Sequence, residues 1–327
     1  MSPQPILPAP HTRIARREFL SASALLAFSA FLEGCQTEPA RTDNNSIIDI
    51  HQHVGYSRRT NDVLLAHQEA MGITLTILLP AGRPYTSPST HNGTTNGLEA
   101  QCLGNADCFR FAQENKTGFL FGANEVPEAP DAVGEIEKYL KRGAVVIGEQ
   151  KFGIDCDSRQ MQRLYDLAAD YRVPVLMHWQ YKMYNYGFER FYRMLEKHPK
   201  TMFIGHAQTW WANIDKNYKD DASNLYPKGP VTPGGLTDRY LSDFPNMFGD
   251  LSAGSGLNAL TRDPDHARDF LRRHQNKLLY GSDCNDPMGQ STGCQGMQTI
   301  AAVRRLAATK KIERKLLCEN ARHLFRL

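Results

Sequence analysis

Histidines and acidic residues end several short apolar segments that lie far apart in the chain. Residues 49–53 read D-I-H-Q-H, so His51 and His53 are separated by a single residue. Side chains two positions apart on a strand point to the same side of the sheet, and two such imidazoles can therefore share one metal ion. Four other apolar segments end in a residue of the same kind, namely V-V-I-G-E at Glu149, V-P-V-L-M-H at His178, M-F-I-G-H at His206 and L-L-Y-G-S-D at Asp283.

A metal ion explains this set of residues better than a structural role does. A single buried histidine is more often a hydrogen-bonded structural residue than a ligand. Burying four imidazoles and two carboxylates at one place without a metal, however, would carry a desolvation cost of several kcal/mol per ion. The sequence therefore predicts a divalent metal site, and Asp49 is expected to orient one of its histidines by a hydrogen bond.

The elements that would position these residues alternate along the chain in the order of a (β/α)8 TIM barrel. Short apolar and β-branched runs predict eight strands, at 47–53, 73–80, 118–124, 145–152, 174–178, 202–206, 247–251 and 277–283. Longer amphipathic segments predict helices between them, at 61–71, 99–114, 131–141, 158–171, 187–197, 263–274 and 295–308. Eight parallel strands with crossover helices close into one barrel, whose active site lies at the carboxyl ends of the strands. The expected domain spans residues 46–327.

The motifs on these strands resemble those of the amidohydrolase superfamily, in particular its amidohydrolase-related (type 2) branch. They are D-I-H-Q-H at 49–53, P-V-L-M-H at 174–178, I-G-H at 204–206, G-S-D at 281–283 and the closing E-N-A-R-H-L-F at 319–325. The resemblance implies a metal, usually zinc, bound by His51, His53, His178 and Asp283. It also implies that His206 binds the substrate or assists catalysis.

The sequence is compatible with either one or two metal ions. The segment V-I-G-E at 146–149 resembles the metal-dependent deoxyribonuclease branch, in which a glutamate on the fourth strand bridges two metals. In that arrangement Glu149 would bridge, and His178 with His206 would hold the second ion. In other relatives a carboxylated lysine bridges the two metals, so Lys151 is an alternative to Glu149 as the bridging residue. If Lys151 has only a structural role, it would form an ion pair with Glu149.

The expected reaction is hydrolysis of an amide, a lactone or another ester of a small molecule. A bound zinc-like ion lowers the pKa of its water and polarises the substrate carbonyl, and Asp283 acts as the general base. Two long connections, 81–97 and 207–244, are expected to form the pocket. The residues expected to contact the substrate are Trp179, Tyr181, Trp210, Trp211 and Arg83.

Two other functions fit the same ligands. Several members of the same branch are decarboxylases, in which the metal orients a substrate carboxylate and carbon dioxide leaves. A non-catalytic surface protein that binds a metal or a sugar is the second alternative, and the intact Asp283 argues against it. Fold alone cannot separate these functions.

The N-terminal region is expected to be an export signal rather than part of the fold. Residues 1–35 combine basic residues with a short apolar run, and R-R-E-F-L at 16–20 resembles a twin-arginine motif read by that export machinery. The segment L-E-G-C at 32–35 resembles a lipoprotein box, so lipidation of Cys35 would anchor the protein to the outer membrane; otherwise it would be periplasmic. Residues 36–45 would be a linker.

Composition and cysteine content narrow the remaining choices. The 327 residues are 41% hydrophobic and 22% charged, with a formal net charge of +3. This is typical of a globular protein with a large core, and no basic stretch in the mature chain predicts nucleic acid as a partner. The spacing of Cys102 with Cys108, and of Cys284 with Cys294, would allow disulfides in an oxidising compartment, or these thiols stay free. The oligomeric state does not follow from the sequence.

Overall fold

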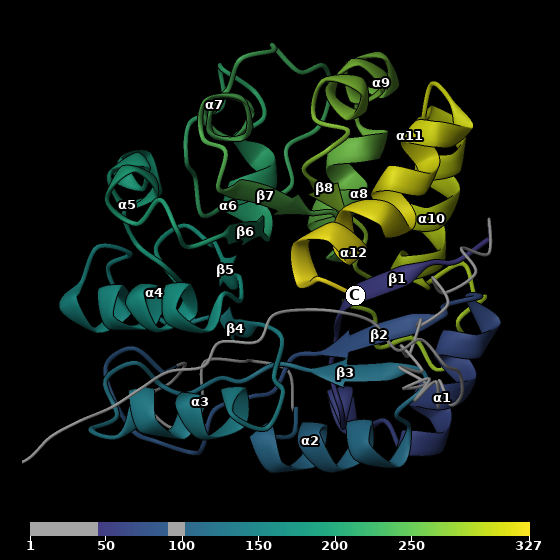
Figure 1. Ribbon diagram of the computed structural model, residues 1–327. Helices are drawn as coiled ribbons and strands as arrows, with labels where there is room; N and C mark the ends of the chain where they lie inside the picture. Colours follow the sequence, from purple (N-terminus) through teal and green to yellow (C-terminus); the bar gives the residue numbers. More distant parts are fainter. Residues whose placement is uncertain (1–44, 91–101) are drawn as a thin grey trace, which may run out of the picture. The chain divides into compact units, whose positions relative to one another are not determined.

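Eight parallel strands alternate with helices in the computed structural model, which describes residues 45–90 and 102–327 (Figure 1). The strands are β1 (Ile48–Gln52), β2 (Leu75–Leu78), β3 (Phe119–Phe121), β4 (Ile147–Gln150), β5 (Val175–His178), β6 (Phe203–His206), β7 (Met247–Asp250) and β8 (Leu278–Leu279). Each lies inside the range that its apolar run predicted, and β8 is only two residues long.

The strands close into a (β/α)8 barrel, as predicted. They pair in parallel in the orders β1-β2-β3 and β4-β5-β6-β7-β8. A bridge between Ala123 and Ile147 joins β3 to β4. The Ile50 amide donates to the Tyr280 carbonyl at 3.2 Å and joins the segment after β8 to β1. All eight strand ends therefore meet around one axis.

The helices lie outside the barrel (Figure 1). Their bounds are α1 (Asn61–Ala70), α2 (Asn105–Glu114), α3 (Ala132–Leu140), α4 (Arg159–Tyr171), α5 (Tyr192–Lys197), α6 (Gln208–Ala212), α7 (Leu236–Asp243), α8 (Ala253–Thr261), α9 (Pro264–Arg273), α10 (Gln295–Leu306), α11 (Lys310–Arg314) and α12 (Asn320–Phe325). Short 3-10 helices occur at Tyr56–Arg58 and Phe188–Arg190, and a π-helical turn at Lys315–Glu319.

Local sequence signals explain where several helices begin. The Ser158 hydroxyl accepts a hydrogen bond from the Met161 amide at 3.3 Å and caps α4. The Asp263 carboxylate caps α9 in the same way, and Pro264 occupies the first helical position. The helix predicted from residue 99 starts only at Asn105, after the extended Gly104.

The long connection at 207–244 contains two helices that were not predicted, α6 and α7. Helix α8 also follows β7 directly, where no helix was predicted. These helices are short, with five, eight and nine residues. Helices of this length are held by packing rather than by an extended apolar periodicity, so the sequence pattern gave little sign of them.

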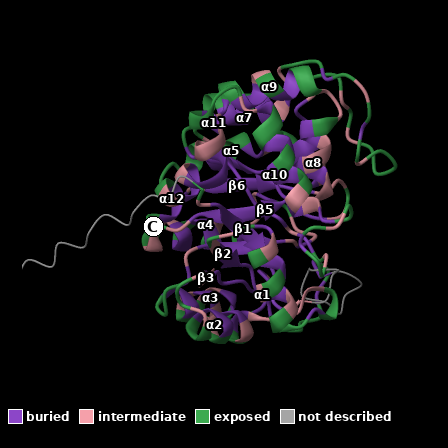
Figure 2. Ribbon diagram, turned by 90° about the vertical axis from the view of Figure 1, so that its right-hand side faces the viewer, coloured by how far each residue is buried: buried purple, intermediate pink, exposed green. Residues whose placement is uncertain are grey.

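Apolar side chains pack on both sides of the strands, one layer inside the barrel and one between the barrel and the helices. The barrel interior contains alternate strand residues such as Ile77, Leu79, Leu176, Ile204 and Phe248, together with Leu324 and Phe325 from the end of α12. The intervening strand residues, such as Leu78, Val175 and Phe203, pack outward against the helices. Figure 2 shows this arrangement as buried strands inside helices whose outer faces are exposed.

An ion-pair cluster joins α7 to the end of α9 and gives a stability prediction. The Asp238 carboxylate accepts hydrogen bonds from His274 Nε2 at 2.6 Å and from Arg273. Burial raises the pKa of Asp238, but these two partners outweigh burial and hold it below the ordinary value of 3.8. We expect Asp238→Asn to destabilise the protein by about 2–3 kcal/mol at pH 7, measured by denaturant unfolding.

The sign of the pH dependence follows from the lowered pKa. Because the folded-state pKa lies below the unfolded one, the contribution of Asp238 is present above about pH 4 and is lost as the pH falls further. The difference between wild type and Asp238→Asn should therefore shrink toward pH 3. Asp265→Asn is the matched control, since the exposed Asp265–Arg268 pair should contribute less than about 1 kcal/mol. An equal loss in both variants would contradict the prediction.

The predicted signal peptide, the linker up to residue 44 and the lipidation site Cys35 lie outside the described residues. Export and lipidation therefore stay predictions. Among residues 45–90 and 102–327, no helix is both long and apolar enough to span a membrane.

Candidate metal centre

The six predicted ligands come together at the carboxyl ends of the strands. His178 and His206 follow the interior residues Leu176 and Ile204 by two positions, so strand alternation directs both imidazoles inward. They lie opposite each other in the β5–β6 register. In β1 and β4 the register shifts next to the ligands, and simple alternation does not place His51, His53 or Glu149.

Glu149 lies between two pairs of imidazoles. Its Oε2 atom is 3.7 Å from the Nε2 atoms of both His51 and His53. Its Oε1 atom lies within hydrogen-bond distance of His178 Nδ1 and is 3.6 Å from His206 Nε2. One carboxylate thus faces two separate sets of nitrogen ligands, and in each set the ligand atoms lie within 4.8 Å of one another.

Asp283 closes the cluster on the side of β8. Its Oδ1 atom is 3.5 Å from His53 Nε2 and 3.7 Å from His51 Nε2, and its Oδ2 atom is 3.6 Å from His206 Nε2. The residue has a left-handed backbone with φ of 43°, which aspartate tolerates better than most residues. Its side chain is 13% exposed, whereas the other five are almost completely buried. Asp283 is therefore the member of the cluster most accessible to a substrate.

Hydrogen bonds from Asp250 and Ser252 fix two of the imidazoles. His51 Nδ1 donates to Asp250 Oδ2 at 2.7 Å. His206 Nδ1 donates to Ser252 Oγ at 3.0 Å, and this hydroxyl in turn donates to Asp250 Oδ2 at 2.7 Å. A carboxylate only accepts, so His51 must carry a proton on Nδ1, and its Nε2 atom faces Glu149 and Asp283.

The other two imidazoles are held in the same manner by different groups. His53 Nδ1 donates to the Leu79 carbonyl at 2.7 Å, which leaves Nε2 for the cluster. His178 has the opposite orientation, because Nε2 faces Gln180 Oε1 at 3.3 Å and Nδ1 faces Glu149. All four rings are thus held at one nitrogen and present the other to a common centre, as metal-binding imidazoles do.

The charges of the cluster also suit a cation. Burial raises the pKa of Glu149, but the neighbouring His178 outweighs burial and holds it well below its usual range. Burial likewise raises the pKa of Asp283, and the charge of His51 outweighs it. These carboxylates are therefore ionised and buried, which requires positive charge nearby. Protons on the imidazoles or divalent ions can supply it, and the donor set fits Zn²⁺.

Asp250 is the main residue that the sequence reasoning missed. It ends the strand M-F-G-D just as His206 and Asp283 end theirs, and it follows the interior residue Phe248 by two positions. That pattern was a usable signal. Burial raises the pKa of Asp250, but hydrogen bonds from His206 and His51 outweigh burial and lower it to about 2. It stays an ionised acceptor for both rings.

We expect Asp250→Asn to weaken metal binding by about 10–100-fold while the protein stays folded. The amide keeps the size of the side chain but removes the charge that holds His51 and His206 in one tautomer. Competition with a chromogenic chelator measures the affinity. Asp243→Asn, an exposed change at the end of α7, should leave the affinity unchanged; a wild-type affinity in Asp250→Asn would contradict the orienting role.

Tyr56 and Cys102 also lie beside the cluster and were not predicted. The ring of Tyr56 packs edge-on against His53, with ring centroids 5.1 Å apart, and burial together with the charge of Asp283 raises the pKa of its hydroxyl. The Cys102 thiol interacts with His53. Neither has a motif that marks it in the sequence, because neither lies on one of the eight strands.

Asp49 and Lys151 contact other groups than the four imidazoles. Asp49 accepts from the amides of His51 at 3.0 Å and Ser282 at 2.8 Å, so it ties β1 to the segment before Asp283 rather than orienting an imidazole. The Lys151 ammonium lies over the Tyr184 ring, 5.3 Å from its centroid. The described structure thus places the Glu149 carboxylate, and not Lys151, between the imidazoles.

The residues predicted to contact substrate lie in different environments. Trp179 and Trp210 are completely buried and pack against Phe188, and Trp211 is 2% exposed; this burial argues against direct contact with a substrate. Arg83 is paired with Glu125 at 2.5 Å and with Asp131 at 2.7 Å.

Tyr181 lines a pocket of about 200 Å³ beside the end of β5. Gln180, which contacts His178, lines the same pocket, together with Lys182, Phe188 and Thr209. The size of this pocket suits a small molecule.

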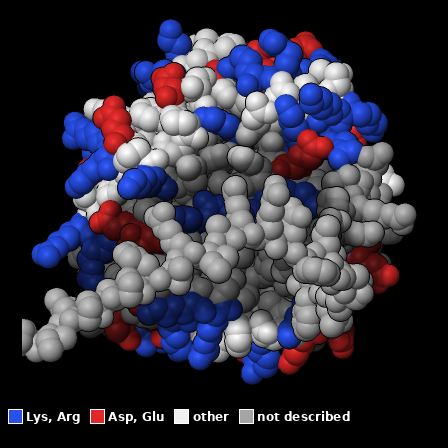
Figure 3. Space-filling model, in the orientation of Figure 1, with Lys and Arg blue, Asp and Glu red and all other residues white. Residues whose placement is uncertain are grey.

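The predicted loop 81–97 is described only up to residue 90, so its part in the pocket stays a prediction. On the face of the molecule drawn in Figure 3, basic and acidic side chains occur side by side.

Comparisons with known proteins agree with this architecture. The family described as Amidohydrolase matches residues 48–327. Similar solved structures include an uncharacterized TIM-barrel protein of Bordetella bronchiseptica, with 16% identity, a TM-score of 0.58 and coverage of 86% of this chain and 98% of that chain. A 2,6-dihydroxybenzoate decarboxylase from Rhizobium has 13% identity and a TM-score of 0.53, with coverage of 86% and 98%. A probable 2-pyrone-4,6-dicarboxylic acid hydrolase from Acinetobacter baumannii has 12% identity and a TM-score of 0.53, with coverage of 87% and 100%. No curated protein matches the sequence.

Proposed function

This chain belongs to the amidohydrolase family, and we propose that it hydrolyses an amide, a lactone or another ester of a small molecule. Family membership makes it an enzyme of the metal-dependent amidohydrolase type, which sets aside the non-catalytic alternative. The observation that favours hydrolysis is the position of Glu149 between two imidazole pairs. Such a position suits a carboxylate that bridges two ions.

Two divalent ions fit the donor set. In this proposal His51 and His53 would hold one ion, His178 and His206 would hold the other, and Glu149 would contribute an oxygen to each. Zn²⁺ is the proposed metal, because imidazole and carboxylate ligands in these numbers suit it. Bound there, the metal would supply Lewis-acid activation of water and of the substrate carbonyl.

Asp283 is the proposed general base. Its carboxylate is ionised and is the most accessible of the cluster, so it can take the proton of the attacking water and return it to the leaving group. His206 faces the same carboxylate, and in this scheme it acts as a ligand rather than as a proton carrier.

Selectivity is assigned to the pocket beside β5. Tyr181 and Phe188 offer aromatic surface there, and Thr209 and Gln180 offer hydrogen-bonding groups. The Thr209 hydroxyl already accepts from the Tyr181 amide at 2.7 Å and so fixes the segment that carries Tyr181. A compact ester or lactone with one unsaturated or aromatic group suits this recess.

Isotope incorporation separates hydrolysis from decarboxylation. The zinc-loaded enzyme is incubated in ¹⁸O-water with a set of small aromatic esters, lactones and anilides, and with hydroxybenzoic acids. Hydrolysis places one ¹⁸O atom in the product carboxylate for each bond cleaved. Release of carbon dioxide from the hydroxybenzoic acids, with no label entering a carboxylate formed from any ester, lactone or anilide, would replace this proposal by the decarboxylase alternative.

A further inference from the structure

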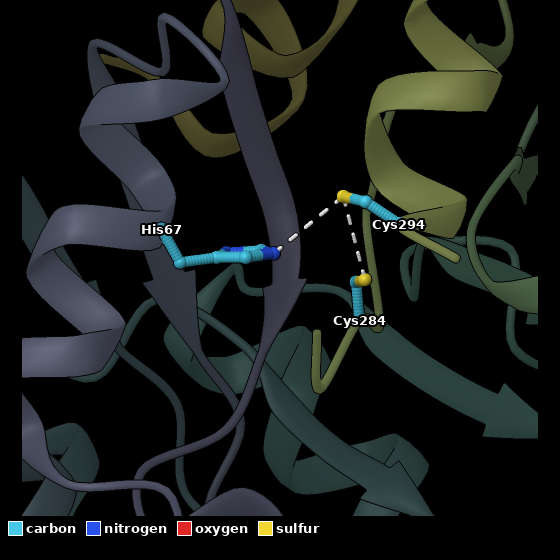
Figure 4. A group of neighbouring side chains, drawn as sticks. All are labelled: His67, Cys284 and Cys294. Carbon is cyan, nitrogen blue, oxygen red and sulfur yellow. Dashed lines mark hydrogen bonds between the residues drawn. The ribbon is translucent and has the colours of Figure 1, made fainter. Parts of the chain in front are cut away.

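A second group of metal-binding side chains lies outside the imidazole–carboxylate cluster. His67 on α1, Cys284 immediately after Asp283, and Cys294 at the start of α10 converge in the core (Figure 4). The two sulfur atoms are 3.6 Å apart, and Cys294 Sγ is 3.7 Å from His67 Nε2. The relative exposures of the three residues are 0%, 3% and 0%. We call this group the thiol cluster.

The spacing of the thiol cluster matches the edges of a tetrahedral coordination shell. An ion about 2.3 Å from each sulfur would hold two thiolates about 3.8 Å apart, and a sulfur and a nitrogen about 3.6 Å apart. A disulfide would instead require about 2.05 Å between the sulfurs. The six cysteines of the described chain are all free thiols, so the disulfides considered for Cys284–Cys294 and Cys102–Cys108 are not formed.

A fourth soft donor lies next to the three. The Met71 thioether sulfur, 4% exposed, is 3.7 Å from Cys294 Sγ. Thiolate and thioether sulfurs favour Zn²⁺ and Cu⁺ over harder cations. His67 Nε2 has only sulfur as a partner, and its Nδ1 lacks a hydrogen-bond partner within the described residues. A buried imidazole with such weak partners is poorly satisfied unless an ion is bound.

We propose that His67, Cys284 and Cys294, with Met71 as the fourth donor, bind one thiophilic cation, Zn²⁺ or Cu⁺. On binding, the two thiols release their protons to solvent. None of these residues belongs to the imidazole–carboxylate cluster, so this site is independent of the proposed function.

The consequence of this site concerns the segment that carries Asp283. The Cys284 carbonyl accepts from Gln52 Nε2 and from Arg59 Nη1, both at 3.0 Å, which fixes its backbone from the side of β1. A cation in the thiol cluster would attach the same residue to α1 and α10 as well. It would hold the loop between Cys284 and Cys294 closed behind the proposed base.

Cobalt titration tests the proposal on the full-length protein. Metal-free, reduced wild-type protein is titrated with Co²⁺, and the intense near-ultraviolet band from sulfur-to-cobalt charge transfer is recorded. A thiolate site predicts one saturable equivalent with this band, and Zn²⁺ or Cu⁺ should abolish it by displacement. Cys284→Ser combined with Cys294→Ser should remove the band or weaken Co²⁺ binding at least tenfold.

Matched controls separate this site from the catalytic one. Cys102→Ser removes the thiol beside His53, and Cys156→Ser removes another buried thiol; both variants should keep the band. His51→Ala should lose activity and still keep it. Loss of the band in Cys102→Ser, its absence from wild type, or two thiols missing from a thiol count of unreduced wild-type protein would overturn the proposal. The wild-type measurements do not depend on how the variants fold.

Discussion

Asp283→Asn is expected to reduce turnover by about 10²–10⁴-fold, the range that a positioned general base contributes. The asparagine amide matches the carboxylate in size but cannot take a proton from water. The change should be confined to kcat, because Asp283 acts on the reacting atoms rather than on the rest of the substrate. Steady-state kinetics on whichever substrate the isotope experiment identifies measures the effect.

Two controls make this result specific. Metal content should be largely retained in Asp283→Asn, since His51, His53, His178, His206 and Glu149 remain. Asp265→Asn, the same chemical change on the exposed face of α9, should leave kcat unchanged. Full activity in Asp283→Asn would remove the general-base assignment, and a complete loss of metal would turn the residue into an essential ligand.

Glu149→Gln is expected to remove at least one metal ion per chain and most of the activity. A neutral amide cannot supply the two anionic oxygens that face the two imidazole pairs, and two divalent cations would then repel each other without the negative charge between them. Elemental mass spectrometry of the purified protein gives the stoichiometry. Any ion in the thiol cluster is present in both proteins and cancels in the difference.

The control for this change is Glu196→Gln on the exposed face of α5, which should alter neither metal content nor activity. An unchanged ion count in Glu149→Gln would show that Glu149 is not needed to hold a metal ion and is a pocket residue instead. Hydrolysis would then lose the observation that now favours it over decarboxylation.

The barrel was predictable because its strands are short apolar runs, and each candidate ligand lies at or near the carboxyl end of one of them. His178 and His206 illustrate this, since alternation from Leu176 and Ile204 directs them inward without further information. The sequence pattern also predicted that Glu149 and Asp283 lie at the carboxyl ends of the barrel strands. Their placement there depends on features that no periodicity encodes, namely a register shift in β4 and a left-handed residue after β8.

Tertiary packing determined what the sequence pattern could not show. Trp179 and Trp210 follow the strands that end in His178 and His206, and they were expected to contact the substrate. Both rings instead fill the space between the barrel and its helices. Asp250 has the same strand-end signal as the ligands but faces the far nitrogens of His51 and His206, so only the folded geometry separates an orienting residue from a ligand. The pocket beside Tyr181 is lined by residues from the segments that follow β5 and β6, so it could not be predicted before the fold was known.

The most direct test of the bridged two-metal site is a crystal structure of the zinc-loaded protein with diffraction data on both sides of the zinc absorption edge. The proposal predicts two anomalous peaks on either side of the Glu149 carboxylate, about 3.5–4 Å apart, one near His51 and His53 and the other near His178 and His206. A single peak at this cluster, or none, at full zinc loading would contradict it.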